Sequence, residues 1–160
     1  MKFGRSDDFY IRRLLKETKL KAIMRTPVIS VKQDEAFSTV ADKFHDHNIR
    51  HLPVVDEINK LVGLITQRDF FRIHSPRRLM DGGEFYDKAS LNQFILKNVM
   101  TKDPFTLTPE QSVADAVTAM AEFKYGCIPI VDKYRELQGI VTNTDILQIA
   151  ADILGRSKAS

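Results

Sequence analysis

The sequence lacks the features that mark several classes of protein. Its 160 residues include one cysteine, Cys127, which cannot form an internal disulfide, so a reducing compartment is the default expectation. No apolar run approaches the roughly eighteen residues that span a bilayer, and no apolar segment follows the charged N-terminal residues as in a secretory signal. Glycine and proline number only 7 and 6 and hydrophobic residues reach 43%, which excludes disorder for the chain as a whole. We therefore expect a cytoplasmic globular protein without a membrane span.

Positive charge is concentrated at the start of the chain. Residues 1–25 hold eight Lys or Arg against three acidic residues, whereas residues 26–160 carry slightly more acidic than basic side chains. Apolar residues at loosely helical spacing, such as Tyr10, Leu14 and Leu15, predict a basic amphipathic leader helix over residues 1–19. Such a segment can contact nucleic acid, an acidic membrane surface or an acidic partner. A solvated amphipathic helix is the favoured explanation, because no aromatic base-stacking pattern accompanies the charges. Nucleic acid is therefore the less favoured partner.

The chain contains an internal repeat. When residues 20–73 are laid on residues 96–149, the two stretches align without a gap, and eleven positions are identical. A gapless register of this length indicates two copies of one structural unit. The identical pairs are Leu20/Leu96, Lys21/Lys97, Met24/Met100, Pro53/Pro129, Val55/Val131, Asp56/Asp132, Leu61/Leu137, Gly63/Gly139, Thr66/Thr142, Asp69/Asp145 and Ile73/Ile149.

Each copy is predicted to fold as a β-α-β-β-α unit, which makes the fold class α+β. Apolar residues at helical spacing follow a short strand, and two apolar strands separated by a polar turn then form a hairpin. The expected elements are a strand over 28–31 or 105–107, a helix around 37–44 or 113–120, strands over 52–55 and 61–65 or 128–131 and 137–141, and a last helix from Thr66 or Thr142.

A unit as small as one copy buries too little surface to be stable alone. We therefore expect the two copies to pack as a pseudo-twofold pair around a shared core. The predicted organisation is a leader over 1–19, repeats over 20–73 and 96–149, a connector over 74–95 on the surface, and a tail over 150–160. Because the first repeat begins only at Leu20, removal of the leader is expected to leave the fold largely intact.

The repeated polar residues form a Thr-x-x-Asp motif in each copy, Thr66–Asp69 and Thr142–Asp145, directly after an apolar strand. One interpretation is a helix-capping box, although Glu or Gln is the usual acidic partner. The other interpretation is a ligand site, because an aspartate can accept two hydrogen bonds from a ribose diol and a threonine hydroxyl can bind phosphate. Both interpretations use the same local geometry.

The two copies differ just before their shared proline. The first copy has Arg50 and His51, where the second has Gly126 and Cys127. An arginine there can hold a phosphate, and a histidine can add charge as the pH falls, although an ion pair and an edge histidine explain them as well. His51 and Cys127 occupy the same repeat position with no orienting third group, so a nucleophilic dyad is not supported. The histidine spacing does not favour a metal site.

Three segments of the first copy carry a resemblance to a known family: Ile23–Val28, Ile49–Asp56 and Leu61–Asp69. The second copy repeats them in order, at 99–101, 128–132 and 137–145. On these segments each copy resembles a CBS domain, the module named after cystathionine β-synthase. The tandem resembles a Bateman module, here a stand-alone CBS pair.

The resemblance implies a regulatory, non-catalytic module that requires no cofactor or metal. It implies an adenosyl ligand, either AMP, ADP, ATP or S-adenosylmethionine, in clefts between the copies. By the family pattern the aspartates bind ribose, the threonines face phosphate, Arg50 and His51 reach phosphate, and the apolar residues border adenine. The ligand residues that the resemblance implies are Ile29, Arg50, His51, Ile65, Thr66, Asp69, Phe105, Val141, Thr142 and Asp145.

Other functions remain open. A ligand-free dimerisation or scaffolding module would use the same apolar helices, with the threonines only capping them. A nucleic-acid-binding regulator would use the basic leader. The resemblance also implies a homodimer formed through the helices of the repeats, and an effector protein on another chain, whose identity the sequence does not give.

Overall fold

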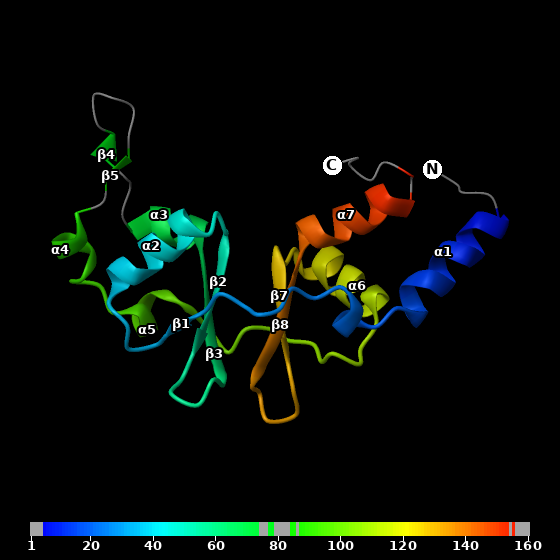
Figure 1. The fold of residues 1–160 in the computed structure, drawn as a ribbon, viewed down its shortest axis with the longest axis horizontal. Coiled ribbons are helices and arrows are strands. Elements are labelled where there is room, and N and C mark those ends of the chain that lie inside the picture. Colours follow the sequence, from blue (N-terminus) through cyan, green and yellow to red (C-terminus); the bar gives the residue numbers. More distant parts are fainter. Residues whose placement is uncertain (1–4, 74–76, 79–83, 86, 154, 156–160) are drawn as a thin grey trace. The chain divides into compact units, whose positions relative to one another are not determined.

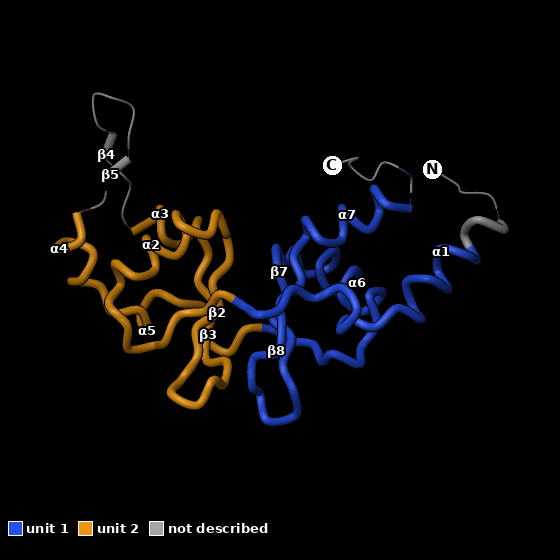
Figure 2. The backbone as a smooth tube through the Cα atoms, viewed as in Figure 1, with its two compact units in different colours: residues 1–28, 105–160 blue, residues 29–104 orange. Residues whose placement is uncertain are grey.

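The computed structural model describes residues 5–73, 77–78, 84–85, 87–153 and 155. The chain forms two compact units (Figure 2). Unit 2 is continuous and consists of residues 29–104, whereas unit 1 combines residues 1–28 with residues 105–160. The compact units therefore cut the chain at different places from the sequence repeats.

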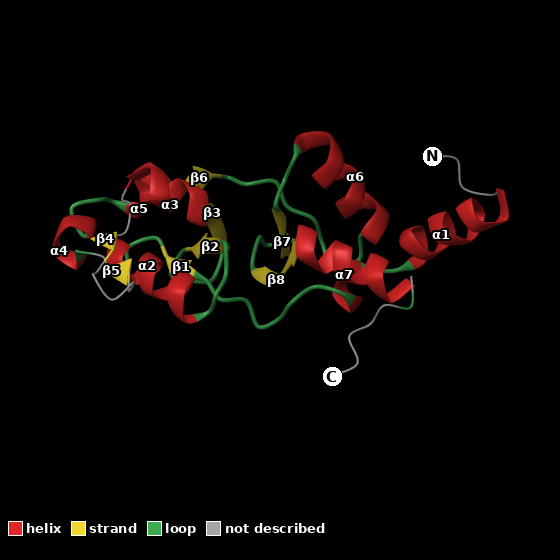
Figure 3. Ribbon diagram, turned by 90° about the horizontal axis from the view of Figure 1, so that it is seen from above, coloured by secondary structure: helices red, strands yellow, loops and turns green. Residues whose placement is uncertain are grey.

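Unit 2 is built on a four-stranded sheet in the order β1-β2-β3-β6 (Figure 1 and Figure 3). The β2–β3 pair is the antiparallel hairpin predicted for the first repeat, while β1 pairs with β2 in parallel and β6 pairs antiparallel with β3. The strands are β1 (Val31–Lys32), β2 (His51–Val55), β3 (Leu61–Thr66), β6 (Thr101–Lys102) and the separate pair β4 (Arg77–Arg78) and β5 (Glu84–Phe85). The helices are α2 (Phe37–Asp46), α3 (Gln67–Ile73), α4 (Lys88–Leu91) and α5 (Leu96–Val99).

Unit 1 contains the hairpin of the second repeat, β7 (Cys127–Val131) and β8 (Leu137–Thr142). Its helices are α1 (Arg5–Glu17), α6 (Val113–Phe123) and α7 (Asn143–Ile153), with a short 3-10 helix η1 (Leu20–Ala22). Within each unit, the two long helices of the repeat lie on one side of its hairpin, α2 and α3 in unit 2 and α6 and α7 in unit 1 (Figure 3). The predicted α+β class and the two hairpins are confirmed.

The opening segment of each repeat packs on the hairpin of the other repeat. In unit 2, Thr101 from the start of the second repeat pairs with Leu64 of β3. In unit 1, Arg25 from the start of the first repeat pairs with Ile140 of β8. The two pairings occupy equivalent positions of the repeat. This exchange of opening segments explains why the compact units and the sequence repeats begin and end at different residues.

Two repeated identities follow from this exchange. A Cβ atom added at Gly63 would collide with the Met100 side chain, and one added at Gly139 would lie 2.5 Å from Met24 Sδ. Each methionine therefore occupies space that any larger residue at the glycine would fill. The Met24/Met100 and Gly63/Gly139 pairs of the repeat are two sides of one packing contact.

The repeated aspartates Asp56 and Asp132 shape the hairpin turns. Asp56 Oδ1 accepts hydrogen bonds from the N–H groups of Ile58 and Lys60, at 3.0 and 2.8 Å. Asp132 Oδ1 accepts the equivalent bonds in the second hairpin at 2.8 and 2.9 Å. An aspartate that satisfies turn N–H groups in this way stabilises the local turn geometry.

The first strand of each predicted repeat is shorter than expected. The strand expected over 28–31 is observed as β1, Val31–Lys32, and the one expected over 105–107 is reduced to a single bridge from Leu107 to Ile130. Leu107 alone donates to Pro129 O and accepts from Val131 N–H, at 3.3 and 2.9 Å. Pro104 and Pro109 border this segment and carry no N–H, so they cannot extend the ladder.

One residue near the end of the predicted connector, Leu91, belongs to the core of unit 2. Leu91 is completely buried there, and Phe94 packs on Phe37 with ring centroids 5.8 Å apart. Asn92 Oδ1 accepts the N–H of Ser38 in the first turn of α2 at 3.0 Å, which satisfies a donor that the helix itself cannot pair. The expectation of a surface connector was therefore wrong for Leu91, whereas residues 92–95 are exposed as expected.

The leader helix α1 is part of unit 1. It packs against α6, and Leu15 contacts the core cluster that contains the completely buried Leu20. The residue after α1, Thr18, is also bonded to α6, because its carbonyl accepts the N–H of Val113 at 2.9 Å at the start of that helix. The amphipathic helix predicted from the sequence is confirmed, and its apolar face has a partner.

Candidate functional site

Thr66 and Asp69 form a closed pair where β3 ends and α3 begins. Thr66 Oγ1 donates to Asp69 Oδ2 at 2.6 Å, and the N–H of Thr66 donates to the same oxygen at 3.2 Å. In return, the N–H of Asp69 donates to Thr66 Oγ1 at 3.1 Å. These reciprocal bonds are a capping box with aspartate in place of glutamate. They use Oδ2 and leave Oδ1 outside the box.

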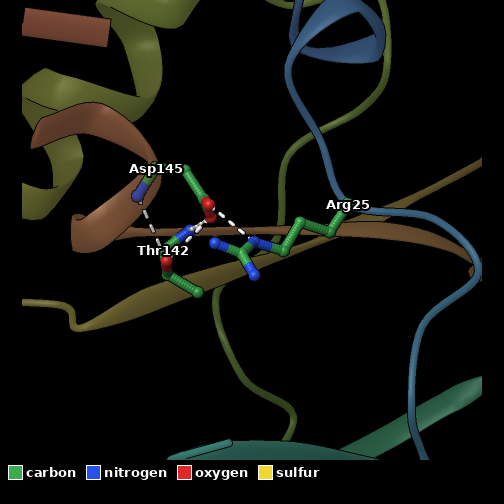
Figure 4. Close-up of polar contacts among 3 residues, drawn as sticks. All are labelled: Arg25, Thr142 and Asp145. Carbon is green, nitrogen blue, oxygen red and sulfur yellow. Dashed lines mark hydrogen bonds and ion pairs between the residues drawn. The ribbon is translucent and has the colours of Figure 1, made fainter. Parts of the chain in front are cut away.

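Thr142 and Asp145 repeat this geometry at the start of α7 (Figure 4). Asp145 Oδ2 accepts from Thr142 Oγ1 at 2.7 Å and from the N–H of Thr142 at 2.8 Å, while the N–H of Asp145 lies 3.4 Å from Thr142 Oγ1. A third residue joins this pair, because Arg25 Nε donates to Asp145 Oδ1 at 2.6 Å. The second pair therefore has an ion-pair partner on Asp145 Oδ1, the carboxylate oxygen that the capping box does not use.

His51 and Cys127 occupy equivalent places beside the two threonines. His51 lies opposite Thr66 in the β2–β3 register, and Cys127 lies opposite Thr142 in the β7–β8 register. Burial lowers the pKa of His51, the Arg50 charge lowers it further, and the Asp69 carboxylate opposes both effects. Burial raises the pKa of the Cys127 thiol to about 12, so the thiolate form is strongly disfavoured at neutral pH.

Arg50 and Gly126 precede these residues at the edge of each site. The carbonyl of Arg50 accepts the N–H of Gln67 at 2.9 Å, and the carbonyl of Gly126 accepts the N–H of Asn143 at 3.0 Å. The backbone of Arg50 is thus fixed next to Thr66, while its side chain is exposed. Unit 2 therefore brings together Arg50, His51, Thr66 and Asp69.

The apolar residues of the predicted site differ in their accessibility. Ile65 and Val141 are completely buried in the cores of unit 2 and unit 1. Ile29 is partly buried and packs against the core of unit 2. Phe105 is 40% exposed. Contact of these four residues with a ligand stays a prediction.

The sequence analysis missed two features of unit 1. Arg25 was noted only as one of the charges of residues 1–25 and as part of the CBS-like segment Ile23–Val28, although it contacts Asp145. Phe105 also belongs to an aromatic cluster, in which Tyr125 stacks on Phe105 and on Phe123 with centroid distances of 5.3 and 5.6 Å. The closely spaced Phe123 and Tyr125, just before Gly126, were the sequence signal for this cluster.

The described residues give limited scope for other chemistry. Among them, no helix combines the length and the apolar character that crossing a bilayer demands. No three His, Cys, Asp or Glu side chains in the described ranges come together as a metal-binding group. What both units share is a hydroxyl and a carboxylate fixed to one another beside a hairpin end, an arrangement that can accept hydrogen bonds from a diol.

The repeated register, the exchanged opening segments and the paired Thr-x-x-Asp boxes define a tandem α+β module. The family model of the CBS domain matches residues 20–75 and 96–152. The chain therefore belongs to the CBS domain family and carries two CBS domains in tandem.

Two curated relatives come from Methanocaldococcus jannaschii. The chain is 31% identical to the uncharacterized protein MJ1404 over 143 residues, and 30% identical to L-aspartate semialdehyde sulfurtransferase over 132 residues. These alignments cover 88% and 82% of this chain but only 34% and 23% of the relatives. The chain thus spans a minor part of each of these proteins.

A solved structure also matches. The CBS domain pair of protein MJ0100, in complex with 5′-methylthioadenosine and S-adenosyl-L-methionine, superposes with a TM-score of 0.70 at 29% identity. The match covers 85% of this chain and 98% of that chain. The likeness therefore extends over nearly the whole of that CBS pair.

Proposed function

We propose that this CBS pair is a regulatory module without catalytic activity. It binds an adenosyl ligand, and this binding controls an effector protein on another chain. The observation that carries the proposal is the Thr66–Asp69 pair, in which the capping box uses Asp69 Oδ2 and leaves Oδ1 for a ribose diol. The CBS pair of MJ0100 with its two adenosyl compounds supports this function, because it is 29% identical to the chain. The candidate ligands are S-adenosylmethionine, AMP, ADP and ATP.

These candidates share the adenosyl group, which is adenine joined to ribose, and their charged groups differ. Asp69 would bind the ribose in each case, while Arg50 would add charge-assisted contacts to an anionic group, above all the phosphates of AMP, ADP and ATP. The phosphate preference of the module therefore depends on Arg50 and its affinity for every candidate depends on Asp69.

A thermal-shift series tests this proposal. A ligand that binds only the folded state raises the melting temperature of the wild type by mass action. Asp69→Asn, which keeps the shape of the side chain, should weaken every ligand that binds, by about ten- to a hundredfold. Arg50→Ala should weaken AMP, ADP or ATP more than adenosine, which lacks the phosphate but keeps the base and the ribose.

The ligand-free scaffold predicts a different result. In that case Asp69→Asn lowers the stability modestly and none of the four compounds moves the melting temperature of any variant. Asp42→Asn provides a matched control, because the partly exposed carboxylate of Asp42 on α2 pairs with Lys88 and not with Thr66 or Asp69. A ligand effect that Asp42→Asn reduces as much as Asp69→Asn would contradict the assignment of Asp69.

A further inference from the structure

The backbone fixes Arg25 beside the Asp145 carboxylate. The N–H of Arg25 donates to Ile140 O at 2.9 Å and its carbonyl accepts from the N–H of Ile140 at 3.2 Å. Arg25 therefore forms an antiparallel β-bridge with β8. From this place Nε reaches Asp145 Oδ1 at 2.6 Å (Figure 4). In this ion pair the Asp145 side chain is only 10% exposed.

Unit 2 has the same backbone arrangement without the arginine. Thr101 takes the equivalent place, paired with Leu64 of β3, and its short neutral side chain cannot form an ion pair with a carboxylate. The Asp69 side chain is 29% exposed, and its Oδ1 has Arg72 Nη1 at 3.9 Å, which exceeds hydrogen-bond distance. One difference between the repeats, Arg25 in place of Thr101, thus separates the environments of the two carboxylates.

The difference matters for a diol. An ionised carboxylate offers about four acceptor positions on its two oxygens. In Asp69 the capping box takes two of them on Oδ2, so the two positions on Oδ1 can receive the two hydroxyl groups of a ribose. In Asp145 the capping box takes the same two and Arg25 takes a third, so one hydroxyl finds no acceptor unless the ion pair breaks.

We infer that Arg25 closes the Asp145 site and restricts the adenosyl ligand to the Asp69 site, so that each chain binds one ligand. The inference rests on the proposed function, since it concerns which of the two Thr–Asp pairs the ligand uses. Arg25 acts here as the residue that sets the occupancy of the second site. A ligand at Asp145 must displace a charge-assisted hydrogen bond, and loss of such a bond corresponds to about a ten- to hundredfold difference in affinity.

Equilibrium dialysis with radiolabelled AMP and radiolabelled S-adenosylmethionine tests the inference, when it is titrated across the tighter Kd so that the stoichiometry of the tight site is measured. The wild type should bind one ligand per chain. Arg25→Thr, which gives unit 1 the residue of unit 2, should bind two, and Asp145→Asn added to it should return the value to one. The reciprocal change Thr101→Arg should weaken binding at Asp69 by about tenfold or more.

Arg13→Thr is the matched control. Arg13 Nε also binds a carboxylate, that of Glu17 at 2.9 Å, but on the exposed face of α1. This variant should bind one ligand like the wild type, which separates the effect of Arg25 from a general loss of positive charge. Thermal unfolding of each variant checks that it is folded.

The outcomes separate the two proposals. If the wild type binds two ligands and both Asp69→Asn and Asp145→Asn lower the binding, Arg25 does not close the Asp145 site. The proposed function as an adenosyl-binding module would still stand. Weaker binding in Arg25→Thr overturns the closure by Arg25 too, because Arg25 would then be a ligand contact. Failure of wild type and all variants to bind either compound, on protein free of co-purified ligand, overturns the proposed function and this inference with it.

Discussion

Met24 packs so closely against Gly139 that an added Cβ atom would lie 2.5 Å from its Sδ and 2.8 Å from its Cγ. Gly139→Ala should therefore destabilise unit 1 by about 1–3 kcal/mol, the usual cost of overpacking a core. Gly63→Ala should cost less, because the atoms that a Cβ would meet there, Met100 Sδ, Cγ and Cε, lie toward the flexible end of the side chain. Chemical denaturation of both variants measures the two free energies of unfolding.

A double-mutant cycle isolates the contact itself. In a Met24→Ala background, Gly139→Ala should cost little, because the side chain that it would meet is gone. If Gly139→Ala is equally harmful in both backgrounds, the exchanged opening segment does not pack on β8 as described.

His51 should make the stability depend on pH. Burial and the Arg50 charge lower the pKa of His51 in the folded state below its ordinary value of 6.5. The unfolded chain therefore binds the proton more readily, and the stabilising contribution is complete above pH 6.5 and is lost as the pH falls through the lower folded pKa. His51→Gln should reduce the drop in melting temperature between about pH 7.5 and about pH 5.5.

His45→Gln serves as the control for this prediction, because His45 is exposed on α2. It should keep the pH dependence of the wild type. An equal loss of pH dependence in both variants, or none in His51→Gln, would show that the burial of His51 is not its source.

Removal of residues 1–18 should lower the stability of unit 1, contrary to the expectation from the sequence, because α1 packs on the core of that unit. The deletion removes Leu15 from the core cluster and leaves the N–H of Val113 without the Thr18 carbonyl. The lost hydrogen bond alone is worth about 1 kcal/mol. Removal of residues 1–8 keeps both contacts and should leave the melting temperature unchanged, whereas equal melting temperatures for the two deletions would contradict a structural role for α1.

The helices that close each repeat carry exposed apolar side chains suited to association. Phe71 on α3 is 40% exposed and Leu147 on α7 is 69% exposed. We expect a homodimer, with twice the 18.3 kDa mass of the chain, in light scattering. Leu147→Glu should shift it toward the monomer, while Ile58→Glu, at a similarly exposed position in a hairpin turn, should not. A wild type that stays monomeric at about tens of micromolar would contradict the expectation.

The repeat made much of the fold predictable from the sequence. Both hairpins, the helix after each hairpin and both Thr–Asp pairs follow from positions that recur at one constant spacing along the chain. Capping boxes and hairpin turns are local structures, so their residues reveal them without knowledge of the tertiary fold. For this reason Thr66, Asp69, Thr142 and Asp145 could be predicted together with their mutual geometry.

The exchange of opening segments could not be predicted in this way. The repeat supplies the same methionine, Met24 or Met100, to both copies, so the sequence fits packing within a copy as well as packing across copies. The contact of Arg25 was missed for a related reason: its partner Asp145 lies 120 residues away, and no periodic pattern links them. Leu91 was assigned to the surface because it lies between charged and polar residues, although tertiary contacts bury it completely.

Isothermal titration of ligand-free protein with AMP, ADP, ATP and S-adenosylmethionine tests the ligand-binding function most directly. At least one of them should bind with measurable heat, and Asp69→Asn should weaken that binding by about ten- to a hundredfold. Heat absent for all four compounds, with protein shown to carry no co-purified nucleotide, would contradict the adenosyl-binding function and favour the ligand-free scaffold.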